Sequence, residues 1–360
     1  APVPKPAPVE KEVVPAAEKP KYGGVLIFGL TADILGFDEG TGTHHYNAHS
    51  QKLTNEILLE GDWARGLAGT GESEWKVGGN VRFTLKTGCL AESWEIPEMG
   101  KMVFHIRKGV MWHNKPGVME TREFTADDVV FTLKRSVTEP RYYTRATYPK
   151  LAATAEITAP DKWTVITKCD PGEHSAMLAM FPDFTLMVPP EVVKKFGSLN
   201  DWRHSVGTGP FILADVVPAS TYSYKRNPNY WGKDPVGPGK GNQLPYLDGV
   251  KYLVIPDVST RMAALRTAKV DHMGSGGATD YVGWEDAKSL MKTHPELKFS
   301  TRIHDSCTNI FMRTDKLDLP FKDKRVRQAL SMAIDRETIA RDYYGGGAEI
   351  LVWPIIYVKD

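Results

Sequence analysis

Three neighbouring histidines are the first residues of this sequence that could do chemistry. His44 and His45 are adjacent, and His49 follows four residues after His45. If this segment is helical, residues four apart lie on one face, so imidazoles could bind one metal ion together. No cysteine or carboxylate joins them at ligand spacing. We therefore predict no metal site, and nickel binding by these histidines stays an alternative.

Sequence patterns of common enzymes are missing from the chain. It contains no phosphate loop of the type Gly-x-x-x-x-Gly-Lys-Ser/Thr, no His-Glu-x-x-His and no Gly-x-Ser-x-Gly. Gly207-Thr-Gly209 precedes a predicted strand, so it lacks the helix N-terminus that holds a dinucleotide. Asp127 and Asp128 are adjacent and would point about 100° apart on a helix, which suits charges at a helix N-terminus better than an acid/base pair. We predict neither an enzyme nor a cofactor.

Two further segments have the composition of ligand-binding loops. Gly274-Ser275-Gly276-Gly277 follows a predicted strand, and its glycines would let a ligand approach backbone N–H groups. A plain flexible turn is the alternative. Tyr142, Tyr143 and Tyr148 could form an aromatic wall of a cleft, although each of them could instead be a surface packing residue.

Composition excludes several classes of protein. The chain has 360 residues, a formal net charge of +1, 41% hydrophobic and 25% charged residues, which is ordinary for a globular protein and gives no reason to expect nucleic acid as a partner. No apolar run approaches the ~20 residues of a membrane span. Cys89, Cys169 and Cys307 are too far apart for a zinc motif and allow at most one disulfide. Residues 1–21 are rich in proline and alanine and are predicted to be a flexible linker.

Helical and strand patterns alternate along the chain, which predicts an α/β fold with mixed sheets. Strands are predicted at 23–29, at 102–106 (where Met102, Phe104 and Ile106 alternate with more polar residues), at 163–167, and as a hairpin at 211–213 and 221–225. Helices are predicted from Leu53 to Gly61, after Thr125 with Asp128 as a capping-box partner, at 191–196, after Ser259, and from Asp323 through Ile334.

Six phrases of sequence resemble one known family. They are Leu90-Ala-Glu-Ser-Trp94, Phe104-His-Ile-Arg-Lys-Gly109, Phe124-Thr-Ala-Asp-Asp-Val-Val130, Leu244-Pro-Tyr-Leu-Asp248, Arg261-Met-Ala-Ala-Leu265 and Phe321-Lys-Asp-Lys-Arg-Val-Arg-Gln-Ala-Leu330. The hairpin from Val206 to Gly232 fits between them. In this order they resemble the extracytoplasmic solute-binding proteins of ATP-binding cassette (ABC) importers, in the peptide/nickel-binding group.

The resemblance implies a periplasmic-binding-protein-like fold of two lobes joined by a hinge. The first lobe would be residues 22–52 with 160–305, an inserted subdomain would be 53–159, and the second lobe would begin at 306. Members of the family continue well past the position of Asp360, so we expect an incomplete second lobe.

Function also follows from the resemblance as an expectation. The protein would capture a solute, most simply a peptide, by closure of the lobes outside the cytoplasm and hand it to the permease of an importer. The ligand would contact Thr43, His44, His45 and Tyr46, a tyrosine among Tyr142, Tyr143 and Tyr148, and Gly274, Ser275 and Gly276. A monomer is expected, with a membrane tether through a lipidated N-terminus. Binding of a nickel chelate or an oligosaccharide, and a role as a structural or interaction subunit at the cell surface, are the alternatives.

Overall fold

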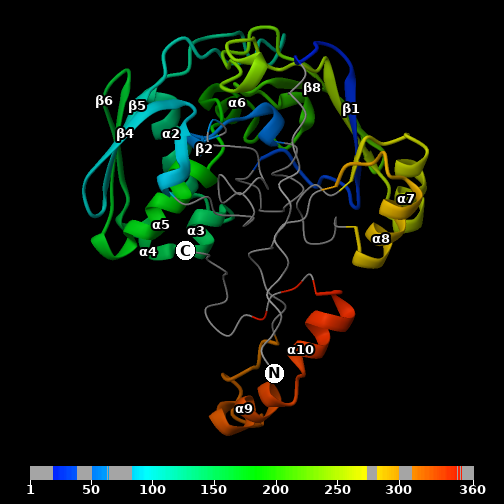
Figure 1. The fold of residues 1–360 in the computed structure, drawn as a ribbon. Coiled ribbons are helices and arrows are strands. Elements are labelled where there is room, and N and C mark those ends of the chain that lie inside the picture. Colours follow the sequence, from blue (N-terminus) through cyan, green and yellow to red (C-terminus); the bar gives the residue numbers. More distant parts are fainter. Residues whose placement is uncertain are drawn as a thin grey trace.

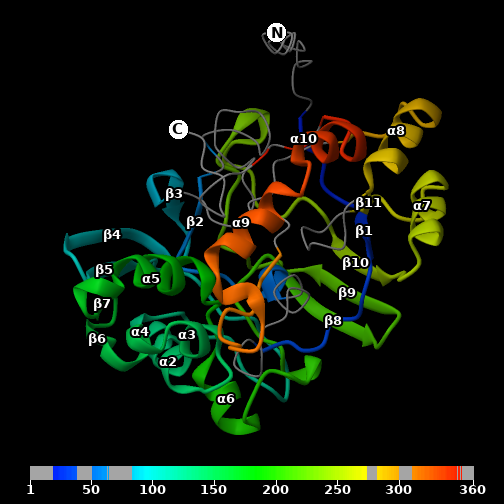
Figure 2. The ribbon, with the colours of Figure 1, turned by 90° about the horizontal axis from the view of Figure 1, so that it is seen from below.

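Two larger β-sheets organise the described part of the protein in a computed structural model (Figures 1 and 2). The buried apolar residues form two separate hydrophobic cores. The structure describes residues 19–38, 51–62, 64, 83–273, 282–299, 310–346, 348 and 350. Helices and strands alternate along these residues, which confirms the predicted α/β class.

The first sheet has five strands in the order β11-β1-β10-β9-β8. Their bounds are β1 Val25–Leu30, β8 Phe211–Val217, β9 Thr221–Arg226, β10 Gly249–Val254 and β11 His272–Met273. β1 runs parallel to β10 and β11, whereas β8, β9 and β10 are antiparallel neighbours, so the sheet is mixed as predicted. The predicted hairpin is β8–β9.

The second sheet has four antiparallel strands in the order β4-β5-β7-β6. Their bounds are β4 Ala91–Glu98, β5 Lys101–Ile106, β6 Glu156–Asp161 and β7 Thr164–Lys168. Met102, Phe104 and Ile106 of β5 are buried, and the residues between them are only half-buried, as the alternation predicts. β2 Leu59–Gly61 and β3 Lys86–Gly88 form a short separate pair.

Most of the helices pack around the two sheets, and several of their ends follow local capping. They are α2 Ala126–Thr138, α3 Tyr143–Thr147, α4 Pro149–Thr154, α5 His174–Ala179, α6 Pro190–Phe196, α7 Val258–Arg266, α8 Trp284–Thr293, α9 Lys324–Met332 and α10 Arg336–Thr338. Thr125 precedes α2, and its backbone N–H donates to Asp128 Oδ2 at 2.9 Å, as the capping-box pattern predicts. Gly197 ends α6 with φ +80°, a conformation that glycine adopts without strain.

Three predicted helix boundaries are wrong. Residues 51–54 are helical, but the chain does not continue as a helix to Gly61, because the Asn55 side chain donates to the carbonyls of Met187 and Val206 and the following residues pair as β2. α7 is capped by Asp257 instead of Ser259, since the Asp257 carboxylate accepts from Thr260 N at 2.7 Å. Asp323 caps α9 as predicted, but this helix ends at Met332 instead of running through Ile334.

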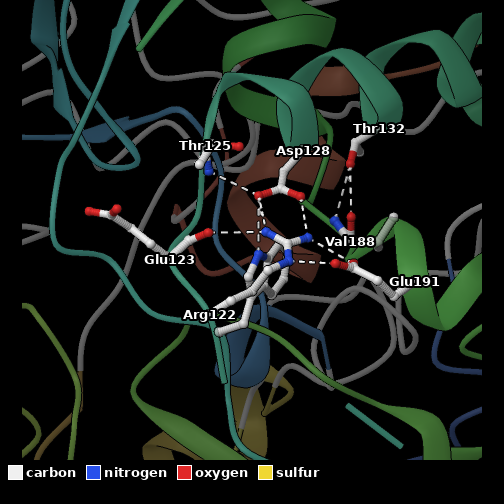
Figure 3. Close-up of polar contacts among 8 residues, drawn as sticks. Arg122, Glu123, Thr125, Asp128, Thr132, Val188 and Glu191 are labelled. Carbon is white, nitrogen blue, oxygen red and sulfur yellow. Dashed lines mark hydrogen bonds and ion pairs between the residues drawn. The ribbon is translucent and has the colours of Figure 1, made fainter. Parts of the chain in front are cut away.

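An ion-pair network joins the start of α2 to the start of α6 (Figure 3). The Arg122 guanidinium donates to both carboxylate oxygens of Asp128 at 2.7 and 2.8 Å and to Glu191 at 2.5 and 2.7 Å. Asp128 also accepts from the indole of Trp112 at 3.2 Å. Bidentate pairs of this kind fix the orientation of the elements that carry them, so this network sets how α6 lies against α2.

α9 and α10 lie apart from both sheets in Figure 1, below the larger body of the chain. Neither helix has a buried side chain, and exposed apolar residues collect in this region: Ile310, Phe311, Leu317, Met332 and Tyr343. Among the residues described, no helix combines the length and the apolar character needed to cross a membrane.

Candidate functional site

A buried polar junction connects the two cores of the protein. His113 Nδ1 accepts from Gly207 N at 3.3 Å, which leaves Nε2 as the protonated nitrogen, and Nε2 donates to Gly209 O at 2.9 Å. Gly209 N in turn donates to Thr54 O at 2.8 Å. A side chain at Gly207 would collide with the Thr54 carbonyl oxygen, so glycine is required by this close approach. Burial lowers the pKa of His113 to about 4, which keeps this imidazole neutral.

The loop after β1 is bonded to elements beside both larger sheets. Asp38 accepts two hydrogen bonds from Arg135 of α2, at 2.8 and 2.9 Å, and a third from Leu199 N at 3.0 Å. Asp33 in the same loop accepts from the Tyr222 hydroxyl of β9. Loops beyond the carboxyl ends of parallel strands commonly bind ligands in α/β sheets. These contacts therefore fix a loop at a position where a ligand site is common.

Buried acidic residues lie beside this junction. Glu56 is 7% exposed and accepts from the Tyr230 hydroxyl at 2.8 Å and from the Trp231 indole at 3.0 Å. Burial raises the pKa of the Glu56 carboxyl. Burial and the nearby Glu56 raise the pKa of Glu60 to about 7. Arg107 lies with its guanidinium carbon 4.6 Å from the centre of the Trp231 ring, which adds a cation to this group of acidic and aromatic side chains.

The tyrosines predicted to line a cleft fall into two environments. Tyr142 is 1% exposed and lies under the Arg135 guanidinium, whose carbon is 5.7 Å from the ring centre. Tyr143 and Tyr148 are half-buried and meet edge to face, with ring centres 6.4 Å apart. Tyr143 also stacks on Phe184 at 4.9 Å. The structure thus brings Tyr143 and Tyr148 into one partly exposed aromatic group, and places Tyr142 in the interior.

The other predicted site residues lie outside the described residues. These are Thr43, His44, His45 and Tyr46 in one segment and Gly274, Ser275 and Gly276 in the other, and His49 of the alternative metal site falls there too. Their contact with a ligand stays a prediction. Within the ranges that the structure describes, no group of three or more His, Cys, Asp or Glu side chains could hold a metal ion.

Phe184 was missed by the sequence analysis. It ends a π-helical turn, Met180–Phe184, and keeps 40% of its surface exposed although it is stacked on Tyr143. The only sequence signal is the run Phe181-Pro-Asp-Phe184, in which proline interrupts an apolar helix pattern. Such a run does not say which of its two phenylalanines is buried.

An open hollow of about 340 Å³ lies beside the polar junction, between the 111–114 segment and the end of β9, and His113 is one of its lining residues. Met111, Ile212, Lys225 and Asn229 are among its lining residues. It contains none of the tyrosines predicted to bind a ligand, so it is separate from the aromatic group.

Solved structures of periplasmic binding proteins have the same fold. The chain is similar to the peptide-binding DppA of Helicobacter pylori in complex with the peptide STSA (TM-score 0.66, 22% identity, 91% of this chain and 59% of that chain). It is also similar to the oligopeptide-binding protein AppA of Bacillus subtilis in complex with a nonapeptide (TM-score 0.65, 24% identity, 91% of this chain and 57% of that chain). These similarities confirm the predicted periplasmic-binding-protein fold.

Sequence comparison gives the family. The model of the bacterial extracellular solute-binding proteins, family 5, matches residues 87–352, so the chain belongs to that family. Similar relatives are heme-binding protein A of Haemophilus influenzae (27% identity over 358 residues, 93% of this chain and 57% of the relative) and the dipeptide-binding protein of Escherichia coli (27% over 272 residues, 71% and 47%). The chain thus spans about half the length of these relatives. The family consists of extracellular binding proteins, not enzymes, in agreement with the predicted class and location.

Proposed function

We propose that this chain is the solute-capturing part of a receptor for an ABC importer and that its ligand is a peptide. The observation that carries the proposal is the family match over residues 87–352, together with a fold shared with proteins whose structures contain bound peptides. Heme is the principal competitor as ligand, because heme-binding protein A is as similar to this chain as the dipeptide-binding protein is.

The proposed mechanism is closure of two lobes around the ligand. The first lobe is residues 22–52 with 160–305, the inserted subdomain is 53–159, and the second lobe begins at 306. β6 and β7 pair with each other and β7 with β5, so in this proposal they belong with the inserted subdomain. Closure of a hinge is linked to occupancy, since a ligand that touches both lobes binds the closed state more tightly. The closed pair of lobes would present a surface to the permease, and a lipidated N-terminus would keep a monomeric receptor near the membrane.

The proposed ligand site combines the three predicted segments. Thr43–Tyr46 and Gly274–Gly276 would offer backbone groups to a peptide, and Tyr143 and Tyr148 an aromatic wall. Partial exposure of these two tyrosines supports this role. Tyr142 would act from the interior, through its packing under Arg135.

Mass spectrometry of the purified protein under native and denaturing conditions tests the proposal. An additional mass that is present only under native conditions and matches a peptide would support the proposal. An additional mass that matches heme would identify heme, instead of a peptide, as the ligand. Titration with a dipeptide library, followed by the shift in melting temperature, provides the second readout. A protein that carries no small molecule and gains no thermal stability from any dipeptide or from heme would contradict a receptor function for this polypeptide.

A surface interaction subunit is the second candidate, and the exposed apolar residues at 310–346 favour it. Apolar side chains gathered on one surface commonly mark contact with another polypeptide. Light scattering coupled to size exclusion distinguishes the candidates: a partner that co-purifies in fixed ratio, with no small molecule bound, supports the interaction subunit.

A further inference from the structure

Phe184 occupies an unusual position for an exposed aromatic residue. Its ring stacks on Tyr143 with centres 4.9 Å apart and planes 30° apart, while 40% of the residue stays open to solvent. Tyr148 meets the other edge of this group, 6.4 Å from Tyr143. These three rings form one partly exposed group, here called the aromatic platform. Tyr143 belongs to α3, Tyr148 lies between α3 and α4, and Phe184 ends the π-helical turn.

The backbone that carries Phe184 is held firmly. Thr185, the next residue, donates to the Met180 carbonyl oxygen through its backbone N–H at 3.1 Å and through its hydroxyl at 2.9 Å. These two bonds close the π-helical turn. π-helical turns are rare and are found frequently at functional sites.

The buried ammonium of Lys86 holds the same turn through an ion pair. Lys86 of β3 has a side chain that is only 3% exposed, and its ammonium pairs with Asp183, the residue before Phe184. Removing a lysine ammonium from water is costly, and a buried ion pair adds little net stability compared with apolar residues of similar size. Its effect here is positional, because it sets where the turn lies relative to β3.

We propose that the aromatic platform is a specificity subsite in which a flat π-system of the ligand stacks on Phe184, with Lys86 and Asp183 as positioning residues. The inference rests on the proposed function and deepens it, since it names the ligand group that the proposed tyrosines, together with Phe184, would prefer. Stacked and edge-to-face rings 4.5–7 Å apart attract beyond their apolar area. The flat group can be the aromatic side chain of a peptide or a porphyrin ring, which share this chemistry.

Calorimetric titration of the whole chain tests the subsite with three probes: the dipeptides Phe-Ala and Leu-Ala, and iron protoporphyrin. We expect Phe184→Leu to weaken Phe-Ala about 3- to 10-fold, the range that one aromatic pair supplies, and to change Leu-Ala less than about twofold. Phe184→Trp keeps an aromatic ring at this position, so its affinity for Phe-Ala should stay close to that of the wild type. If the porphyrin is the ligand, Phe184→Leu should weaken porphyrin binding, Phe184→Trp should keep it, and the dipeptides should not bind.

Matched controls separate the subsite from general effects. Tyr22→Leu removes another exposed ring, which is 52% exposed and lies tilted against Tyr246 with ring centres 5.1 Å apart, and it should leave all affinities unchanged. Lys86→Met should weaken Phe-Ala more than Leu-Ala, whereas Lys162→Met, which breaks the exposed pair with Glu123, should change neither.

Two results would overturn the inference in distinguishable ways. Equal weakening of both dipeptides by Phe184→Leu, or no weakening at all, would remove the subsite and leave the receptor function intact. Failure of the wild-type chain to bind any of the three probes would remove the proposed function and the subsite with it.

Discussion

Arg135 of α2 binds Asp38 of the loop after β1 through two parallel hydrogen bonds of 2.8 and 2.9 Å, with side chains only 8% and 0% exposed. These residues are 97 positions apart and belong to elements around different sheets. The pair therefore determines how the loop beside the five-stranded sheet lies against the helix that covers the other sheet.

Breaking this pair should be costly. Asp38→Asn leaves the Arg135 guanidinium buried without a carboxylate, so we expect the free energy of unfolding to fall by about 3 to 5 kcal/mol in urea titrations. Asp315→Asn is the matched control, because Asp315 makes a similar bidentate pair with Arg313 at the surface and should cost less than about 1 kcal/mol. Equal losses in the two variants would contradict the importance of burial here.

His113 should make the protein less stable in weak acid. Its pKa is about 4 in the folded protein and 6.5 ordinarily, so below pH 6.5 the unfolded chain binds a proton that the folded chain excludes. Stability is complete above pH 6.5 and is lost as the pH falls towards 4, by roughly 3 kcal/mol. Denaturant titrations of wild type and His113→Gln from pH 8 to 4 measure this. The glutamine variant should lack this part of the pH slope, and parallel slopes would refute the assignment.

Glu60 should act in the opposite direction. Burial and repulsion from Glu56 raise its pKa from 4.5 to about 7, so its contribution favours the folded state below pH 4.5 and is lost as the pH rises through 7. Glu60→Gln should therefore stabilise the protein by roughly 1 to 3 kcal/mol at pH 8 and by little at pH 4. Thermal unfolding at both pH values checks this against Glu98→Gln, whose side chain is 68% exposed. A Glu60→Gln gain that is the same at both pH values would argue against the raised pKa.

The two carboxylates bound by Arg122 should differ in their contribution to stability (Figure 3). Asp128 is 1% exposed and accepts from Arg122, Trp112 and Thr125, whereas the side chain of Glu191 is 49% exposed. We expect Asp128→Asn to cost about 3 kcal/mol or more and Glu191→Gln less than about 1 kcal/mol. Urea unfolding of both variants gives the ranking, and the reverse order would contradict it.

Local patterns in the sequence determined much of the secondary structure. Alternation at Met102, Phe104 and Ile106 predicts β5, and Pro190 with Gly197 predicts both ends of α6. These signals work because strand alternation and helix capping depend on neighbours a few residues away. The six family phrases extended this to the fold and family, which the comparisons confirm.

Tertiary structure decided the features that depend on distant residues. The helix expected at 53–61 is interrupted because Asn55 bonds to carbonyls more than 130 residues away, and local periodicity carries no information about such partners. The same holds for Phe184, which stacks on Tyr143, a residue distant in the sequence, and follows Asp183, the partner of Lys86. Sequence alone thus determined elements whose signals are local, such as β5 and α6, whereas tertiary packing decided where the 51–54 helix stops and which polar and aromatic side chains meet.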